Sequence, residues 1–170
     1  FVDLLKTKLL FNENITSNIS LTSNNLGNKL VNSADLNINI KNGVINFDNS
    51  KLVSNKIGFL QVPESNLFFR DKALILNSDF NIKVKNTAKL FSYFQTPKRL
   101  RIPINSFLFN VDFNFFNGEI TLNSLRINNQ KPNQKIEFVI DEFNEVKGID
   151  LENLIKNRNL FNQLLEVYSG

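Results

Sequence analysis

The feature that most constrains the fold is an alternation of apolar and polar residues that runs directly into an Asn-Gly pair. Leu36, Ile38 and Ile40 alternate with polar side chains, which is the period-2 pattern of a half-buried strand. The pair Asn42-Gly43 follows, and a type I′ hairpin turn favours it because both central positions need a positive φ. The predicted cross-strand pairs are Lys41 with Val44, Ile40 with Ile45, and Ile38 with Phe47. The apolar residues of both strands then share one face, so the turn and the pattern predict the same hairpin.

A second, longer hairpin is predicted around Asn117-Gly118. Every second residue of the segment Phe107–Phe115 is apolar, and apolar residues recur after the turn. The predicted pairs are Phe115 with Ile120 and Phe113 with Leu122. Beyond Ser124 the apolar positions change phase, which predicts a β-bulge near that residue.

The remaining periodicity predicts further strands and a few helices. Strands are expected at residues 15–21, 57–62, 66–70 and 73–85, while residues 1–11 fit either a strand or a short helix. The expected helices, the first with Asn86 as its N-cap, are Thr87–Phe94, Ile136–Phe143 and Asp150–Tyr168.

These elements predict an α+β fold with a predominantly antiparallel, curved β-sheet of long hairpins that forms an open groove. A short helix at about 87–95 and a C-terminal amphipathic helix accompany the sheet. Residues 1–130 are expected to form the β-rich domain, and residues 131–170 a helical segment packed on it.

Composition narrows the chemistry that is available to this chain. It contains no cysteine and no histidine, which removes disulfides, thiolate metal sites and the commonest general base. Asp141, Glu142 and Glu145 cluster on one expected short helix, where a solvent-facing side is a simpler interpretation than a paired acid/base site. The run Asp48-Asn49-Ser50 lacks the rest of a calcium loop. We therefore expect no enzymatic activity, no catalytic residues, no metal and no cofactor.

Charge and hydropathy limit the classes of binding partner that we expect. The net charge is +4, from 20 basic and 16 acidic side chains scattered along the chain, so nucleic acid is not expected as a partner. No apolar run reaches the ~18 to 20 residues of a membrane-spanning helix. The start, Phe1-Val2-Asp3, has neither an initiator methionine nor a signal-peptide pattern, which is typical of a segment from a longer chain.

Asparagine makes up about one residue in six, far above average usage. Asn, Ile, Lys and Phe share A/T-rich codons, so an A/T-rich genome is the simpler explanation. The alternative is a functional ladder of stacked asparagines.

Five segments in a fixed order carry a resemblance to a known family. They are Ala34–Asp48, Ile57–Leu60, Lys89–Gln95 with the sequence Lys-Leu-Phe-Ser-Tyr-Phe-Gln, Arg99–Ile104, and Phe107–Ile127. Together they span roughly residues 30–130. This order resembles the C-terminal region of AsmA-like proteins, a family of bacterial envelope proteins that includes the YhdP-like and TamB-like groups.

The resemblance implies a periplasmic protein, tethered to the inner membrane through a segment outside this chain. Its strands would form an apolar groove along which phospholipids cross between the inner and outer membranes. The implied partners are phospholipid acyl chains and, through the parent chain, a membrane; the family is not enzymatic. The residues expected to line the groove are Leu36, Ile38, Ile40, Ile45, Phe47, Phe107, Phe109, Val111, Phe113, Phe115, Ile120 and Leu122.

Several alternatives stay open at the level of sequence. Lys98, Arg99 and Arg101 suit phospholipid head groups, but such a cluster also fits a solvated loop. The stripe Phe107–Phe115 fits a groove lining and an ordinary core equally. The C-terminal helix has mixed charge, which favours packing on the sheet over a place on a membrane surface.

The alternative function is a structural or adhesive β-rich domain that binds a protein or a glycan. A groove leaves an apolar strip uncovered, whereas an adhesive domain buries its apolar face. The chain has few aromatic residues in its expected loops, which favours the groove.

Overall fold

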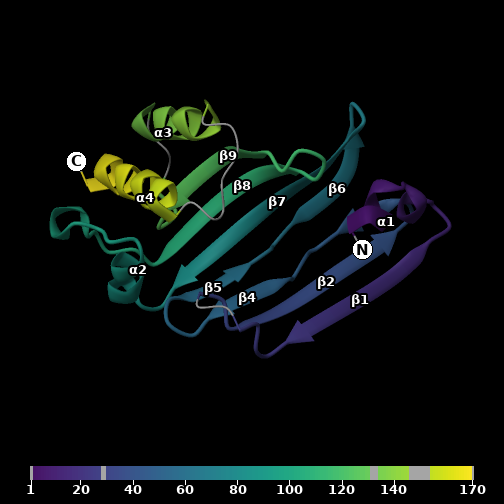
Figure 1. The fold of residues 1–170 in the computed structure, drawn as a ribbon, viewed down its shortest axis with the longest axis horizontal. Helices are drawn as coiled ribbons and strands as arrows, with labels where there is room; N and C mark the ends of the chain where they lie inside the picture. Colours follow the sequence, from purple (N-terminus) through teal and green to yellow (C-terminus); the bar gives the residue numbers. More distant parts are fainter. Residues whose placement is uncertain (1, 28–29, 131–133, 146–153, 170) are drawn as a thin grey trace.

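The computed structural model describes residues 2–27, 30–130, 134–145 and 154–169. Over these residues the chain has the predicted α+β fold, in which one nine-stranded antiparallel sheet is accompanied by short helices (Figure 1). The strands are β1 (Thr16–Ser23), β2 (Ser33–Lys41), β3 (Val44–Asn46), β4 (Lys51–Ser54), β5 (Gly58–Gln61), β6 (Ser65–Arg70), β7 (Ala73–Val84), β8 (Ser106–Asn114) and β9 (Ile120–Ile127). The helices are α1 (Val2–Lys6), α2 (Thr87–Tyr93), α3 (Gln134–Glu145) and α4 (Leu154–Ser169), with short 3₁₀ helices η1 (Leu9–Phe11) and η2 (Lys98–Leu100).

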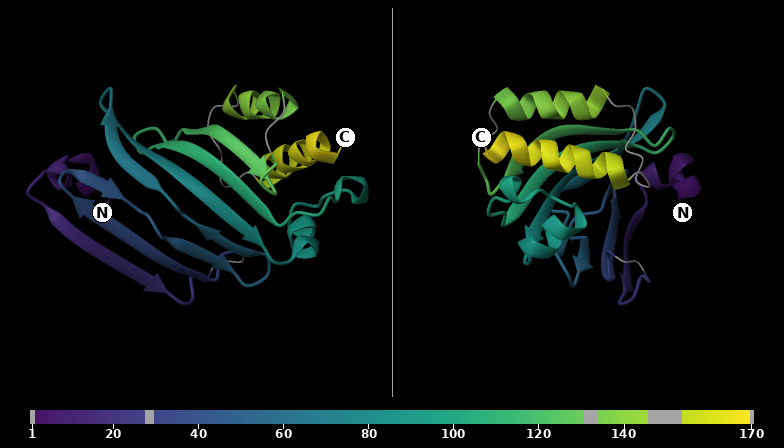
Figure 2. Two further views of the ribbon diagram at one scale, coloured as in Figure 1. Left: turned by 180° about the vertical axis from the view of Figure 1, so that it is seen from behind. Right: turned by 60° about the vertical axis from the view of Figure 1, so that its left-hand side comes forward.

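The sheet is an antiparallel meander. At two positions in the strand order, a pair of short strands stands where one long strand would be expected. β2 pairs with β1 along one side, and with both β3 and β4 along the other. In the same way, β5 and β6 both pair with β7. β8 and β9 then extend the sheet beyond β7. β1 and β9 lie at opposite edges and do not pair with each other within the described residues, so the sheet is open (Figure 2).

Side chains bridge the interruption between these short strands. The Asp48 carboxylate accepts hydrogen bonds from the Ser65 backbone N at 2.7 Å and from its Oγ at 3.0 Å. The Ser50 Oγ accepts a hydrogen bond from the Asn37 backbone N at 2.9 Å. Ser50 and Ser65 are buried, so these bonds satisfy polar groups that water does not reach.

Predictions that depend on neighbouring residues are confirmed. Asn42 and Gly43 have φ angles of 51° and 73°, as the predicted turn requires. The Asn86 side chain caps α2 by accepting a hydrogen bond from the Lys89 backbone N at 3.0 Å. The pairs that form next to the first turn are Lys41 with Val44 and Ile40 with Ile45.

The predicted pair Ile38–Phe47 is wrong. The ladder ends at Asn39–Asn46, and the Phe47 backbone N donates instead to the Ser65 Oγ at 2.6 Å. The chain leaves β2 at this point, and β2 continues its pairing with β4, a strand that the sequence did not indicate. The interruption between β3 and β4 is therefore the physical reason for the error.

The predicted register of the second hairpin is also wrong, by two residues. Its loop is longer than a two-residue turn: the Asn114 backbone N donates to the Glu119 carbonyl at 2.9 Å, and the Asn114 side chain accepts from the Phe116 backbone N. Phe113 pairs with Ile120 in place of Phe115, and Val111 pairs with Leu122 in place of Phe113. The bulge expected near Ser124 is confirmed, because the register shifts opposite Asn123, which lies next to it.

The helices follow the expectations with some changes of boundary. The helix expected at Ile136–Phe143 is α3, and the C-terminal amphipathic helix is α4; its expected N-terminal residue, Asp150, lies outside the described residues. The sequence allowed either a strand or a short helix at residues 1–11, and the described part of this segment contains α1 and η1. None of the described helices is long and apolar enough to cross a membrane.

Candidate functional site

Two rows of apolar side chains cross the sheet on one face, which we call the apolar face. Residues paired across antiparallel strands point to the same face, so the pairings define each row. The first apolar row is Ala34, Leu52, Leu60, Ile82, Phe107 and Ile127. The second apolar row is Ile40, Ile45, Leu67, Leu76, Phe113 and Ile120. An uninterrupted apolar lane across several strands is a surface that suits extended hydrocarbon better than a compact polar ligand.

The opposite face of the sheet, which we call the polar face, carries hydrogen-bonded amides. Asn77 donates to the Asn110 Oδ1 at 3.0 Å, and Asn110 donates to the Asp79 carboxylate at 2.7 Å. Asn123 extends this ladder to β9 by donating to the Asn110 Oδ1 at 2.8 Å. Asn77, Asn110 and Asn123 are therefore joined by hydrogen bonds across β7, β8 and β9, and over these strands the polar face differs from the apolar face in polarity.

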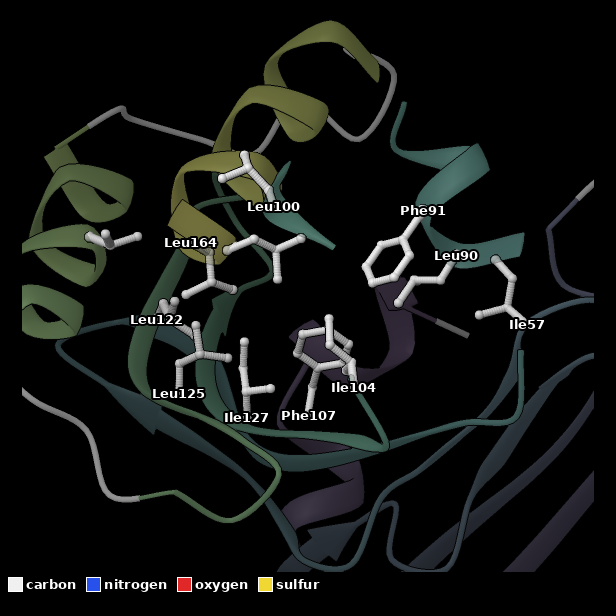
Figure 3. Close-up of a cluster of buried hydrophobic side chains, with 12 residues drawn as sticks. Ile57, Leu90, Phe91, Leu100, Ile104, Phe107, Leu122, Leu125, Ile127 and Leu164 are labelled. Carbon is white, nitrogen blue, oxygen red and sulfur yellow. The ribbon is translucent and has the colours of Figure 1, made fainter. Parts of the chain in front are cut away.

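Helices α2, α3 and α4 cover the apolar face at its β8–β9 end. Figure 3 shows Leu90 and Phe91 of α2 and Leu164 of α4 on the same side of the sheet as Phe107 and Ile127. All five side chains are buried and belong to one cluster. This end of the first apolar row is therefore core.

Two cavities remain beneath these helices. The larger, which we call the α4 cavity, has a volume of about 320 Å³ and is lined only by apolar residues, namely Phe94, Phe109, Val111, Leu122, Leu125, Val139, Phe143, Leu160, Phe161 and Leu164. The smaller, which we call the α2 cavity, has a volume of about 200 Å³; its lining includes Leu52, Leu60 and Ile82 of the first apolar row and Leu90, Tyr93 and Phe94 of the α2 region. Sites for small apolar ligands are concave and mostly apolar, with volumes of roughly 300 to 1,000 Å³.

Phe94, the residue that directly follows α2, borders both cavities. Its ring stacks on Phe161 of α4, with centroids 4.0 Å apart and an interplanar angle of 16°. Its backbone carbonyl accepts a hydrogen bond from the Asn162 side chain at 3.4 Å. Phe94 therefore contributes to the walls of both cavities, and Phe161 to the wall of the α4 cavity.

Helix α1 covers the second apolar row at the opposite end. Leu5 is only 1% exposed and packs with Ile40, Ile45 and Leu67 in a second buried cluster. On the β1 side of the apolar face, coverage ends: the paired residues Leu21 and Leu36 are 53% and 39% exposed. The apolar face is thus core at both ends and partly open at one edge.

The structure divides the predicted groove residues into two groups. Five of them are buried in the two clusters, which makes them core in this structure: Ile38, Ile40, Ile45, Phe107 and Leu122. The others are half-buried or exposed on the apolar face: Leu36, Phe47, Phe109, Val111, Phe113, Phe115 and Ile120. Of the twelve, Phe109, Val111 and Leu122 line the α4 cavity.

The predicted head-group residues lie at η2, outside both cavities. Lys98, Arg99 and Arg101 are all exposed. Arg99 lies 3.7 Å from the Glu166 carboxylate, and the Arg101 Nε donates to the Thr96 carbonyl at 3.1 Å. Exposed ion pairs of this kind contribute little stability. Their role in binding a head group stays a prediction.

Several lining residues were not identified from sequence. Leu52 belongs to the unpredicted strand β4, and Phe143, Leu160 and Phe161 were assigned only to helices. No sequence pattern indicated that α3 and α4 leave a cavity over β8 and β9. That property depends on how the helices pack on the sheet.

Within the described residues, no group of three acidic side chains is placed to hold a metal ion. Burial raises the pKa of the Tyr168 hydroxyl above its ordinary value of 10.0, while the hydrogen bond from the Ile127 backbone N lowers it in part. By accepting this hydrogen bond, the Tyr168 hydroxyl pairs the Ile127 backbone N–H of the edge strand β9.

Comparisons with protein-family models, with curated proteins and with solved structures find no match to this chain. The resemblance to AsmA-like proteins therefore stays a prediction.

Proposed function

We propose that this chain is a non-enzymatic lipid-handling module of a bacterial envelope protein, and that its apolar face carries phospholipid acyl chains in transit between the inner and outer membranes. The proposal places it in the periplasm, tethered to the inner membrane through a segment outside this chain. The observation that carries it is the first apolar row, which crosses the sheet from Ala34 to Ile127 and borders the α2 cavity.

The distribution of polarity supports this proposal. Burying an unpartnered polar group against hydrocarbon costs about 2 kcal/mol or more, so a lane for acyl chains must lack such groups. The α4 cavity meets this condition because all of its lining residues are apolar. The amide ladder lies on the other face, so Asn77, Asn110 and Asn123 are paired without entering the lane.

The partial coverage of the apolar face supports it as well. Buried clusters lie at both ends of the apolar face, while Leu21 and Leu36 leave its β1 edge accessible. An adhesive domain that buried its apolar face would not expose a cross-strand pair of leucines there. The head-group role of Lys98, Arg99 and Arg101 is not needed for this proposal.

Two isosteric variants on opposite faces test the proposal. Leu60 lies on the apolar face and borders the α2 cavity, whereas Leu108 lies on the polar face; both are half-buried strand residues. The protein is mixed with vesicles that contain a fluorescent phospholipid, and the lipid that leaves with the protein is measured. We expect Leu60→Asn to reduce extraction at least fivefold and Leu108→Asn to leave it near wild type.

The competing function predicts a different result. A protein that extracts no phospholipid, and that also carries none in native mass spectrometry after purification, would be a structural or adhesive domain instead. Equal loss in both variants would show that extraction reflects general destabilisation. Urea unfolding of both variants is measured alongside, so that a folding defect is recognised.

A further inference from the structure

The two edges of the sheet are protected to different degrees. At the β9 edge, side chains from the helices bond to the strand backbone: Asn144 pairs both backbone groups of Leu122, and the Tyr168 hydroxyl accepts from the Ile127 backbone N. Within the described residues, by contrast, only β2 pairs with β1, and no side chain bonds to the β1 backbone. Figure 1 shows β1 at the rim of the sheet. Alternate residues of an antiparallel strand point both backbone groups away from the neighbouring strand, so β1 presents a row of free donors and acceptors.

β1 also lacks the features that keep edge strands from pairing with another chain. Its sequence is Thr-Ser-Asn-Ile-Ser-Leu-Thr-Ser, with no charged residue and no proline. It pairs with β2 without a bulge, through every residue from Thr16, opposite Lys41, to Ser23, opposite Ala34. Natural edge strands usually carry a lysine, a proline or a bulge, each of which disfavours edge-to-edge pairing. β1 is therefore an edge that can accept a further strand.

The sequence of β1 is complementary to itself. Ile19 and Leu21 lie on the apolar face, opposite Ile38 and Leu36 of β2, whereas Ser20 lies on the polar face. When two β1 strands pair antiparallel with Ser20 opposite Ser20, each Ile19 lies opposite Leu21 of the other copy. The apolar face then continues across the junction, and free backbone groups meet free backbone groups. The Leu21 side chain, which is 53% exposed, gains an apolar neighbour across the strands.

We propose that the partner of the β1 edge is a second copy of this chain, and that the two β1 strands pair antiparallel about a twofold axis at Ser20. Because β1 carries no charge, the two copies meet without like charges opposite each other. Side chains of α3 and α4 already cover the β9 edge, so this pairing closes at two copies instead of continuing into a fibre. The dimer extends the apolar face, but it does not depend on the proposed function, because backbone groups form the junction without a lipid.

Crosslinking through a single introduced thiol tests the position of the axis. The chain contains no cysteine, so Ser20→Cys carries one thiol only. Directly opposite residues of antiparallel strands have Cα atoms about 4.5 to 5.5 Å apart, which a disulfide can span. Oxidation with copper phenanthroline should therefore convert most of Ser20→Cys into a linked dimer on a non-reducing gel. Ser124→Cys is the matched control, because Ser124 is also an exposed strand serine on the polar face, but it belongs to β9; it should stay a single chain.

Charges at the same position test the pairing without a covalent bond. Like charges directly opposite each other repel, so Ser20→Lys and Ser20→Glu should each raise the dissociation constant of the dimer about fivefold or more in sedimentation equilibrium. An equimolar mixture of the two variants should pair at least as tightly as wild type, because unlike charges then lie opposite each other. Ser124→Lys should pair as wild type does. The midpoint of urea unfolding shows that each variant is folded.

Three results would overturn the inference. The first is a wild-type protein that stays monomeric at its highest soluble concentration, which would leave the β1 edge to a strand of another protein. The second is equal crosslinking of Ser20→Cys and Ser124→Cys, and the third is a mixture of Ser20→Lys and Ser20→Glu that pairs no better than either variant alone. Leu60→Asn, on β5, should leave the dimer unchanged, so loss of pairing and loss of phospholipid extraction are separate results.

Discussion

Asn144 of α3 closes the outer edge of the sheet, and its removal should destabilise the protein measurably. Its Oδ1 accepts a hydrogen bond from the Leu122 backbone N at 2.8 Å, and its Nδ2 donates to the Leu122 carbonyl at 3.0 Å. Leu122 is only 9% exposed, so Asn144→Ala leaves a backbone donor and an acceptor with poor access to water. At about 1 to 1.5 kcal/mol for each group, the free energy of unfolding should fall by about 2 to 3 kcal/mol.

The matched control is Asn123→Ala. Asn123 also donates two side-chain hydrogen bonds, to Asn110 at 2.8 Å and to Asp112 at 3.2 Å, but it lies exposed on the polar face. Water can replace these bonds, so the loss should stay below about 1 kcal/mol. Urea unfolding followed by circular dichroism gives both values, and the melting temperature of Asn144→Ala should fall by roughly 4 to 10 °C for a chain of this size.

The Asn144 variant should also expose an unpaired strand edge. β9 would then present free backbone groups, which favour edge-to-edge association. Light scattering during unfolding should rise earlier for Asn144→Ala than for Asn123→Ala. If Asn123→Ala costs as much stability as Asn144→Ala, the edge-capping argument is refuted.

Three further outcomes are expected. A Cβ at Gly58 would lie 1.9 Å from the Lys83 carbonyl oxygen, so Gly58→Ala should lower the free energy of unfolding in urea by about 3 kcal/mol or more. Gly118 has φ +73° but lies in open space, so Gly118→Ala should lower it by only about 1 to 2 kcal/mol. Similar losses for the two variants would contradict the steric contact between position 58 and Lys83. Because the pKa of Tyr168 is raised in the folded state, the unfolded chain loses this proton first, and the free energy of unfolding should fall as pH rises through and above 10. Tyr168→Phe should lack this fall in stability above pH 10. The same pH dependence in Tyr168→Phe and wild type would refute the assignment to Tyr168. Leu67 is 1% exposed in the cluster beneath α1, so Leu67→Ala should cost about 2 to 5 kcal/mol by chemical unfolding, and a loss below 1 kcal/mol would show that this cluster is loosely packed.

Local rules in the sequence predicted the elements well. The φ angles of Asn42-Gly43 and the cap by Asn86 depend on residues a few positions apart, and both are confirmed. The bulge beside Ser124 was visible as a change in the phase of apolar residues. Alternation of period two likewise identified which residues of β2 and β8 share the apolar face.

Features set by distant parts of the chain were missed. β4 has no alternating pattern of its own, and its place depends on pairing with β2 and β5. The register of the β8–β9 hairpin depends on the Asn114 side chain, which stabilises a longer loop than Asn117-Gly118 suggested. The two cavities depend on how α2 and α4 lie over the sheet, and the Phe94–Phe161 contact beside the α4 cavity joins residues far apart in sequence.

The most direct test of the central claim is photo-crosslinking with a phospholipid that carries a diazirine near the end of one acyl chain, followed by residue-level mass spectrometry. The account predicts crosslinks on the apolar face, at Leu52, Leu60 and Ile82, and their loss in Leu60→Asn. Crosslinks centred on the polar face, at Asn77 and Asn110, or none above the background of a soluble control protein, would contradict it.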